Sequence, residues 1–184
     1  DYFVGHLKEL YGIPFILNTI PIGSVQVKRW LFEIADFFGL RSEAERVVAT
    51  EESALRRALE PIRARLAGKR VFVSAGEIRA GAQAIMLETD LGMEVVAVRA
   101  HHYDQYGDVL FEELKPETPV NVAASQPFEQ VNLLKRLRPD VYVGHLGGNV
   151  WTAKLGIPVL PIFGPVNSYM GYRGIHEVAV RLDR

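Results

Sequence analysis

Short apolar runs, each bounded by Gly, Pro or polar residues, recur through the second half of the chain. The clearest runs cover residues 70–74, 93–98, 140–144 and 157–163. Because these runs are apolar on both faces, they predict strands buried on both sides, as in a parallel sheet covered by helices. The pattern predicts an α/β fold, with a three-layer Rossmann-like domain built on a parallel sheet over residues 68–184.

Helical periodicity fills the intervals between these strands. The expected elements are helices over residues 77–91, 127–137, 148–155 and 168–182, and one more short strand over residues 120–124. Gly171 and Gly174 weaken the prediction of the last helix. Ligands of such sheets bind beyond the carboxyl ends of the strands, so we expect function in the loops that follow them.

The first 67 residues predict a helical segment in front of this domain. The expected elements are helices over residues 1–10, 24–38 and 42–67, and a short strand over residues 13–17. We interpret residues 1–67 as a strand and helices that belong partly to a preceding domain.

Local signals set the expected ends of these helices. Ser24 is a suitable N-cap, and Ser42 with Glu45 has the spacing of a capping box. Gly39 fits the end of the helix that begins at Ser24. Pro61 lies inside the long third helix, where we expect a kink or a break.

Composition narrows the classes of function. The net charge of −1 gives no electrostatic case for nucleic acid or for an anionic membrane. No apolar run approaches the ~20 residues needed to span a bilayer. The first residues lack the basic region of a signal peptide, so we expect a cytoplasmic protein. The chain has no cysteine, which excludes disulfides, thiolate catalysis and cysteine-held clusters within it.

The first strand-to-helix turn contains Gly76 and Gly81 and carries Arg79. The spacing of its glycines matches neither a dinucleotide fingerprint nor a P-loop. One interpretation is a tight turn with close helix packing. The other is a binding site for an anionic group, held by Arg79 and by backbone N–H groups at the start of the helix.

The second strand runs into His101 and His102. Adjacent residues of an extended chain point in opposite directions, and no third ligand follows at a useful spacing, so the pair does not predict a metal site. The residues could belong to a solvated loop. They could also donate a proton or contact a substrate, because imidazole titrates near neutral pH.

Two later loops offer further candidates. His145 and Asn149 follow the fourth strand, where Asn149 could cap a helix or contact a ligand and His145 could face a cleft. Tyr169 lies in a stretch over residues 164–174 that is rich in Gly, Pro and aromatic residues. This stretch is either a buried connection or the wall of a pocket.

Several short segments occur here in an order and spacing that resemble a known family. These segments are residues 11–15, 34–38, 44–47, 66–71, 76–79, 91–96, 100–104, 138–140, 154–158 and 171–174. Together they resemble the component 1 proteins of the nitrogenase superfamily. This superfamily includes the nitrogenase α and β subunits, cofactor-assembly scaffolds and related reductases of tetrapyrroles. The resemblance is strongest to the α-subunit or scaffold type.

The resemblance implies that the complete protein has three Rossmann-like domains. It implies a sister component 1 subunit, in a heterotetramer, and electrons supplied by an ATP-dependent iron–sulfur reductase. An iron–sulfur cluster or metallocofactor is implied for the full-length complex, with none held by this chain. Arg79 matches an arginine that faces the cofactor or substrate cavity, and Gly76 belongs to its turn.

The chain departs from the family pattern in two ways. The family's cluster cysteines would lie before Asp1, and Pro161 lies near the position of the histidine that binds the cofactor in nitrogenase α subunits. The departures favour a scaffold or a paralogous reductase over a true nitrogenase catalytic subunit.

The leading hypothesis is a domain of a nitrogenase-like oxidoreductase, inactive on its own. It reduces a substrate or a bound metallocofactor in a cavity that Arg79, His101, His102, Asn149 and Tyr169 would line. Arg79 would stabilise negative charge and a histidine would donate a proton. The alternatives are a non-catalytic scaffold for metallocluster assembly and a nucleotide or nucleotide-sugar binding domain from outside this superfamily.

Overall fold

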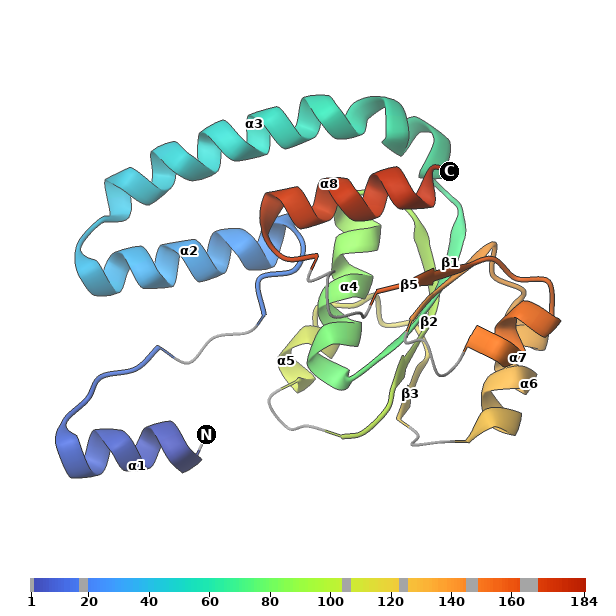
Figure 1. Cartoon of the computed structure of the whole chain (residues 1–184), viewed down its shortest axis with the longest axis horizontal. Coiled ribbons are helices and arrows are strands. Elements are labelled where there is room, and N and C mark those ends of the chain that lie inside the picture. The colour runs from blue at the N-terminus through green and yellow to red at the C-terminus, as the bar shows by residue number, and fades with distance from the viewer. Residues whose placement is uncertain (1, 17–19, 104–106, 123–125, 145–148, 163–168) are drawn as a thin grey trace.

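A five-stranded parallel sheet with helices on both faces organises the chain, as a computed structural model shows (Figure 1). The structure describes residues 2–16, 20–103, 107–122, 126–144, 149–162 and 169–184. The α/β architecture with a parallel sheet confirms the fold class expected from the sequence. Among the described helices, none has the length and apolar character that a bilayer span requires.

The strand order in the sheet is β3-β2-β1-β4-β5. The strands are β1 (Arg70–Ala75), β2 (Glu94–Ala100), β3 (Val120–Val122), β4 (Val141–Gly144) and β5 (Val159–Pro161). Every pairing between them is parallel, and β1 lies at the centre between β2 and β4. All five strands therefore end at the same edge of the sheet.

Alternate residues of β1 enter two separate hydrophobic cores. Val71 and Val73 join the larger core, and Phe72 joins the smaller one, where its ring stacks on that of Tyr142 with 5.7 Å between the centroids. Such alternation is what a strand buried on both faces requires.

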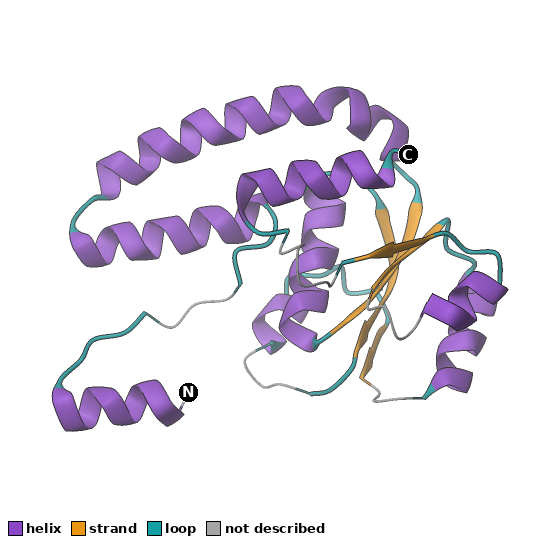
Figure 2. Ribbon diagram, viewed as in Figure 1, coloured by secondary structure: helices purple, strands orange, loops and turns teal. Residues whose placement is uncertain are grey.

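Figure 2 shows the helices that cover the two faces of the sheet. Apolar residues of α4 (Glu77–Thr89), α5 (Asp108–Phe111) and α8 (Gly171–Leu182) pack in the larger core. The smaller core lies beneath α6 (Pro127–Leu137), and Leu155, just after α7 (Asn149–Lys154), packs against it.

Three helices precede the sheet. In α1 (Tyr2–Tyr11) no residue is buried, and this helix lies apart from the others in Figure 1. In contrast, α2 (Ser24–Phe38) and α3 (Arg41–Leu66) bury apolar side chains in the same core as α4 and α8. The division of the chain at residue 67 stays a prediction.

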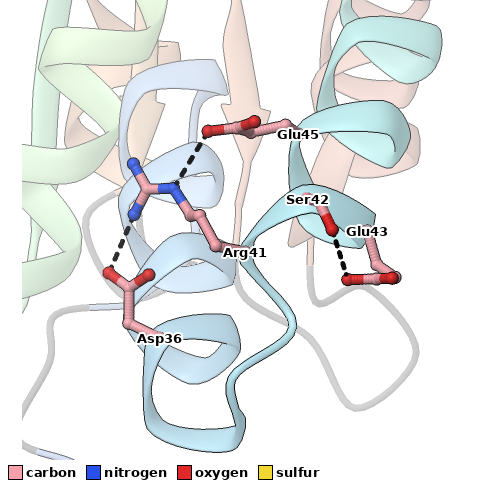
Figure 3. A network of polar contacts seen from close by, with 5 residues as sticks. All are labelled: Asp36, Arg41, Ser42, Glu43 and Glu45. Carbon is pink, nitrogen blue, oxygen red and sulfur yellow. Dashed lines mark hydrogen bonds and ion pairs between the residues drawn. The ribbon is translucent and has the colours of Figure 1, made fainter.

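A polar cluster closes the corner between α2 and α3 (Figure 3). The Arg41 guanidinium contacts the carboxylate of Asp36 at 2.8 Å and that of Glu45 at 3.3 Å. It also lies over the ring of Phe32, 3.9 Å from the centroid. Because the two ion pairs are exposed to solvent, each contributes little to stability. The corner itself depends on Gly39, whose left-handed φ of 68° ends α2.

The predicted caps of α2 and α3 are wrong. Gly23 is the N-cap of α2, and the Ser24 hydroxyl donates instead to Asp90 at the far end of α4. Leu40 is the N-cap of α3, so Ser42 lies inside the helix and bonds to Glu43. The Asp90 carboxylate thus lies at the N-terminus of α2, where the helix dipole favours an anion.

Three further expectations are corrected or refined. Residues 13–16 form no strand, and Leu17 lies outside the described residues. Pro61 does not break α3, because it lies on an exposed stretch where the carbonyl of Arg57, which loses its helical partner, can bond to water. The alternative expectation of a kink at Pro61 stays a prediction. Gly174 lies inside α8 although glycine is a poor helix former. Only glycine fits at this position, because a Cβ there would overlap the Tyr169 backbone.

The link between Ser24 and Asp90 predicts a pH-dependent loss of stability. Burial raises the pKa of Asp90, and the two bonds from Ser24 oppose this effect. Ser24→Ala removes the hydroxyl bond, so the pKa of Asp90 in the folded state rises further. We expect a loss of about 1 to 2 kcal/mol at neutral pH. The loss should shrink as the pH falls through the folded pKa, where the carboxyl is protonated.

Urea unfolding of the protein at a series of pH values measures this loss. Ser42→Ala is the matched control, since its hydroxyl bonds only to an exposed neighbouring glutamate. A deficit of the same size at every pH would contradict the assigned role of Asp90.

Candidate functional site

The candidate site begins where β1 and β2 end side by side. Ala75 pairs with Ala100, and the backbone N–H of His101 donates to the carbonyl of Ala75 at 2.9 Å. This bond extends the parallel pairing by one residue. The chain after β1 and the chain after β2 therefore leave the sheet at neighbouring points, which brings Gly76 and the histidine pair together.

His102 lies against Gly76. A Cβ built on Gly76 would come within 3.3 Å of the His102 Cε1 atom. The backbone of Gly76, with φ −59° and ψ 149°, is open to any residue. The imidazole of His102 thus rests on the turn because Gly76 has no side chain.

Arg79 lies in the first turn of α4, three residues after Gly76. Its side chain is half-buried, and this burial lowers the pKa of the guanidinium. Arginine stays charged even so, because its ordinary pKa is far above neutral pH. The first turn also holds Glu77, which is 1% exposed. The turn after β1 therefore combines a half-buried cation with a buried carboxyl group.

A buried polar cluster beneath His101 was not predicted from the sequence. Ser74 Oγ lies 3.0 Å from His101 Nε2, and Tyr142 and Gln130 extend the cluster away from the sheet edge. Arg99, also buried, pairs in register with Ser74. The only sequence signal was polar residues at the ends of otherwise apolar strands.

The remaining candidates are not brought into this group by any described contact. Asn149 begins α7 after β4, and its side chain lies outside the described part of the structure, as does His145. Tyr169 is 2% exposed and packs in the larger core, with its ring 5.6 Å from the Arg181 guanidinium. Burial raises the pKa of Tyr169. Its assignment to a ligand stays a prediction.

In the part of the chain that the structure describes, neither a metal-binding cluster nor the groove beside α3 coincides with the candidate site. Among the described residues, no three His, Cys, Asp or Glu side chains are grouped so that they could hold a metal ion. A groove of about 830 Å³ lies between α3 and the end of α4, near Asp90. Its lining is a mixture of arginines, acidic residues and leucines, and it includes none of the candidate residues.

Comparison with known proteins gives one consistent result. The profile of the family "Nitrogenase component 1 type Oxidoreductase" matches residues 1–184. The nitrogenase iron-molybdenum cofactor biosynthesis protein NifE of Rippkaea orientalis is 32% identical, over 96% of this chain and 38% of its own length. The nitrogenase molybdenum-iron protein alpha chain of Methanothermobacter marburgensis is 28% identical, over 97% of this chain and 38% of its own length.

A solved structure supports the fold. The chain superposes on "Nitrogenase Cp1 at pH 5" with a TM-score of 0.81 and 19% identity, over 99% of this chain and 43% of that one. This likeness concerns the fold alone. The chain spans about two fifths of the length of the curated relatives it matches.

The contact between Gly76 and His102 predicts that the mutation Gly76→Ala alters the surroundings of the His102 ring and leaves the rest of the fold unchanged. In Gly76→Ala the new methyl group displaces the exposed imidazole by a few tenths of an ångström, while the backbone keeps its conformation. We expect the free energy of unfolding to change by less than about 0.5 kcal/mol. The NMR signals of the His102 ring should shift.

Gly174→Ala is the contrasting variant, since its methyl group meets backbone atoms that cannot move aside. It should be destabilised by about 1 to 3 kcal/mol. Equal stability losses in the two variants would contradict the proposed packing of His102.

Proposed function

Because the chain belongs to the nitrogenase component 1 type oxidoreductases, we propose that it is a domain of a component 1 protein in the cytoplasm. In this proposal the complete protein receives electrons from an ATP-dependent iron–sulfur reductase and transfers them to a substrate or bound metallocofactor. The alternative of a nucleotide-binding domain from outside this superfamily disagrees with the family match.

The grouping of Arg79, His101 and His102 at one edge of the sheet carries the proposal. A half-buried guanidinium stabilises negative charge that builds up during reduction, and it does so more strongly than in water. An imidazole at the same edge of the sheet can supply a proton near neutral pH. This combination suits a reaction that adds electrons and protons to a bound group.

The described residues do not fit the task of coordinating a metallocofactor. The cation of Arg79 cannot be a ligand. In the part of the chain that the structure describes, no third His, Cys, Asp or Glu is grouped with the two histidines so that they could hold a metal ion. A bound metallocofactor would supply the redox chemistry. We assign Arg79 and the histidines to the outer surroundings of such a group, where they bind and orient it by charge and hydrogen bonds.

An apolar surface supports the proposal of a protein partner. Exposed aromatic and aliphatic side chains gather along α2 and the segment before it, around a groove of about 390 Å³. The groove is lined by Pro14, Phe15, Ile16, Trp30, Ile34, Phe37 and Phe38. Surfaces of this kind are usually covered by another protein segment. A sister component 1 subunit or a further domain of the same protein would fit.

The scaffold function is the second candidate. It is favoured by the similarity to a cofactor biosynthesis protein and by Pro161, at the end of β5, near the position expected for a cofactor-binding histidine. A scaffold would hold a metallocluster for transfer and would need no turnover. The two functions share the fold and differ in whether electrons reach a substrate.

Turnover with the cognate reductase separates these candidates. The complete protein, purified anaerobically with its sister subunit, should contain iron and should form a reduced product only when ATP and the reductase are present. Iron without turnover, together with transfer of the cluster to an acceptor protein, would support the scaffold. A protein without iron would exclude both.

Arg79 provides a test of the assigned residues. We expect Arg79→Ala to lower the reductase-dependent rate by about a hundredfold, because it removes the charge that stabilises the reduced group. Arg79→Lys should lose less, since it keeps the charge without the planar fork. Arg136→Ala, on the exposed face of α6, is the matched control. Equal rates in Arg79→Ala and the control would contradict the role.

A further inference from the structure

The residue before His102 is tied to β1. The backbone N–H of His101 donates to the Ala75 carbonyl at 2.9 Å, and Nε2 of the His101 ring lies 3.0 Å from the hydroxyl oxygen of Ser74. Ser74 is 1% exposed, so the strand that makes these two contacts is fixed in the core. The chain is therefore held in place on the N-terminal side of His102.

The residue after His102 is tied to α5. The Tyr103 hydroxyl donates a hydrogen bond to Oδ2 of Asp108 at 2.9 Å. Asp108 is the first residue of α5, five positions further along the chain. A phenol that donates to a carboxylate forms a charge-assisted bond, which is stronger than a bond between neutral groups. The chain is therefore held on the C-terminal side of His102 as well.

Two close contacts fix α5 against α4. A Cβ on Gly107, just before α5, would come within 2.7 Å of the Glu77 Cγ atom. A Cβ on Gly81 would come within 2.7 Å of the Leu110 Cβ atom. Glu77 is 1% exposed and Leu110 is fully buried, so neither side chain can easily move aside. Because α4 also carries Arg79, the start of α5 has a fixed place relative to that cation.

We infer that Tyr103 and Asp108 are positioning residues that hold the imidazole of His102 on the turn after β1. With the chain held on both sides, the Cα–Cβ bond of His102 keeps its direction and the ring stays against Gly76. That turn leads into α4, so the bond also sets the place of the imidazole relative to Arg79. The consequence for reduction rests on the proposed function, whereas the packing of His102 does not.

Removing either partner of the bond should release the ring. Tyr103→Phe removes the donor and Asp108→Ala removes the acceptor, whereas Asp108→Asn keeps an amide oxygen that can accept the same proton. In the first two variants we expect the equilibrium between the docked and the released ring to shift about fivefold towards release. The free energy of unfolding should stay nearly the same, because the bond lies at the surface.

Proton NMR of the protein measures the docked population without any activity assay. The nuclear Overhauser effect between the His102 proton on Cε1 and the Gly76 α-protons reports the contact. We expect this effect in the original protein, a weaker one in Tyr103→Phe and in Asp108→Ala, and no change in Asp108→Asn. The His102 signals are identified by their loss in His102→Gln.

Two controls separate this bond from a general effect of substitution. Tyr11→Phe removes an exposed hydroxyl from α1, which lies apart from the sheet, and should leave the effect at full strength. The double variant that combines Tyr103→Phe with Asp108→Ala should lose no more than either single variant, since both changes remove the same bond.

Two results would overturn the inference. One is a nuclear Overhauser effect that keeps its full strength in both Tyr103→Phe and Asp108→Ala. The other is a loss in Asp108→Asn as large as that in Asp108→Ala. If the complete protein showed no turnover, the proposed function would fail while the NMR results still decided how His102 is held, so the two can fail separately.

Discussion

The parallel pairing of β1 with neighbours on both sides is the constraint on which the rest of the structure depends. It forces β2 and β4 to end beside β1, so the residues after each strand meet at one edge. It also buries both faces of β1, which explains why Val71 and Val73 serve one core while Phe72 serves the other. At Ser74 the same alternation places a buried hydroxyl on the face of the smaller core, where it needs a partner, and His101 provides one.

The sheet was predictable because its strands are short, apolar on both faces and separated by clear breaks. The helix ends were harder to predict from the sequence, because local rules assign the hydroxyls of Ser24 and Ser42 to caps of their own helices. In the folded chain Ser24 finds the stronger acceptor in Asp90, 66 positions away. A partner so distant along the chain leaves no local signal. Pro61 fails as a helix breaker for a related reason, since its exposed position makes the lost hydrogen bond inexpensive.

The candidate site was predictable in its place and only partly in its members. The edge of the sheet and the approach of Gly76 to the histidine pair follow from strand order. The buried polar cluster beneath His101 does not, because Ser74, Tyr142 and Gln130 come from β1, β4 and α6, which are far apart in the sequence. Tyr169 illustrates the same limit. Its glycine-rich surroundings left open a buried connection and a pocket wall, and the packing of its ring in the core beside Arg181 comes from residues distant in the chain.

The two outer strands of the sheet have a consequence for association with other chains. As far as the structure describes them, β3 and β5 each consist of three residues, whereas β1 and β2 at the centre have six and seven. An outer strand this short offers few unpaired amides to a foreign strand, so growth of the sheet from one molecule into the next is discouraged. Pro161 strengthens this protection at β5, because it has no backbone N–H to donate. The aromatic surface along α2 can therefore remain exposed for a specific contact without the sheet edge competing for it.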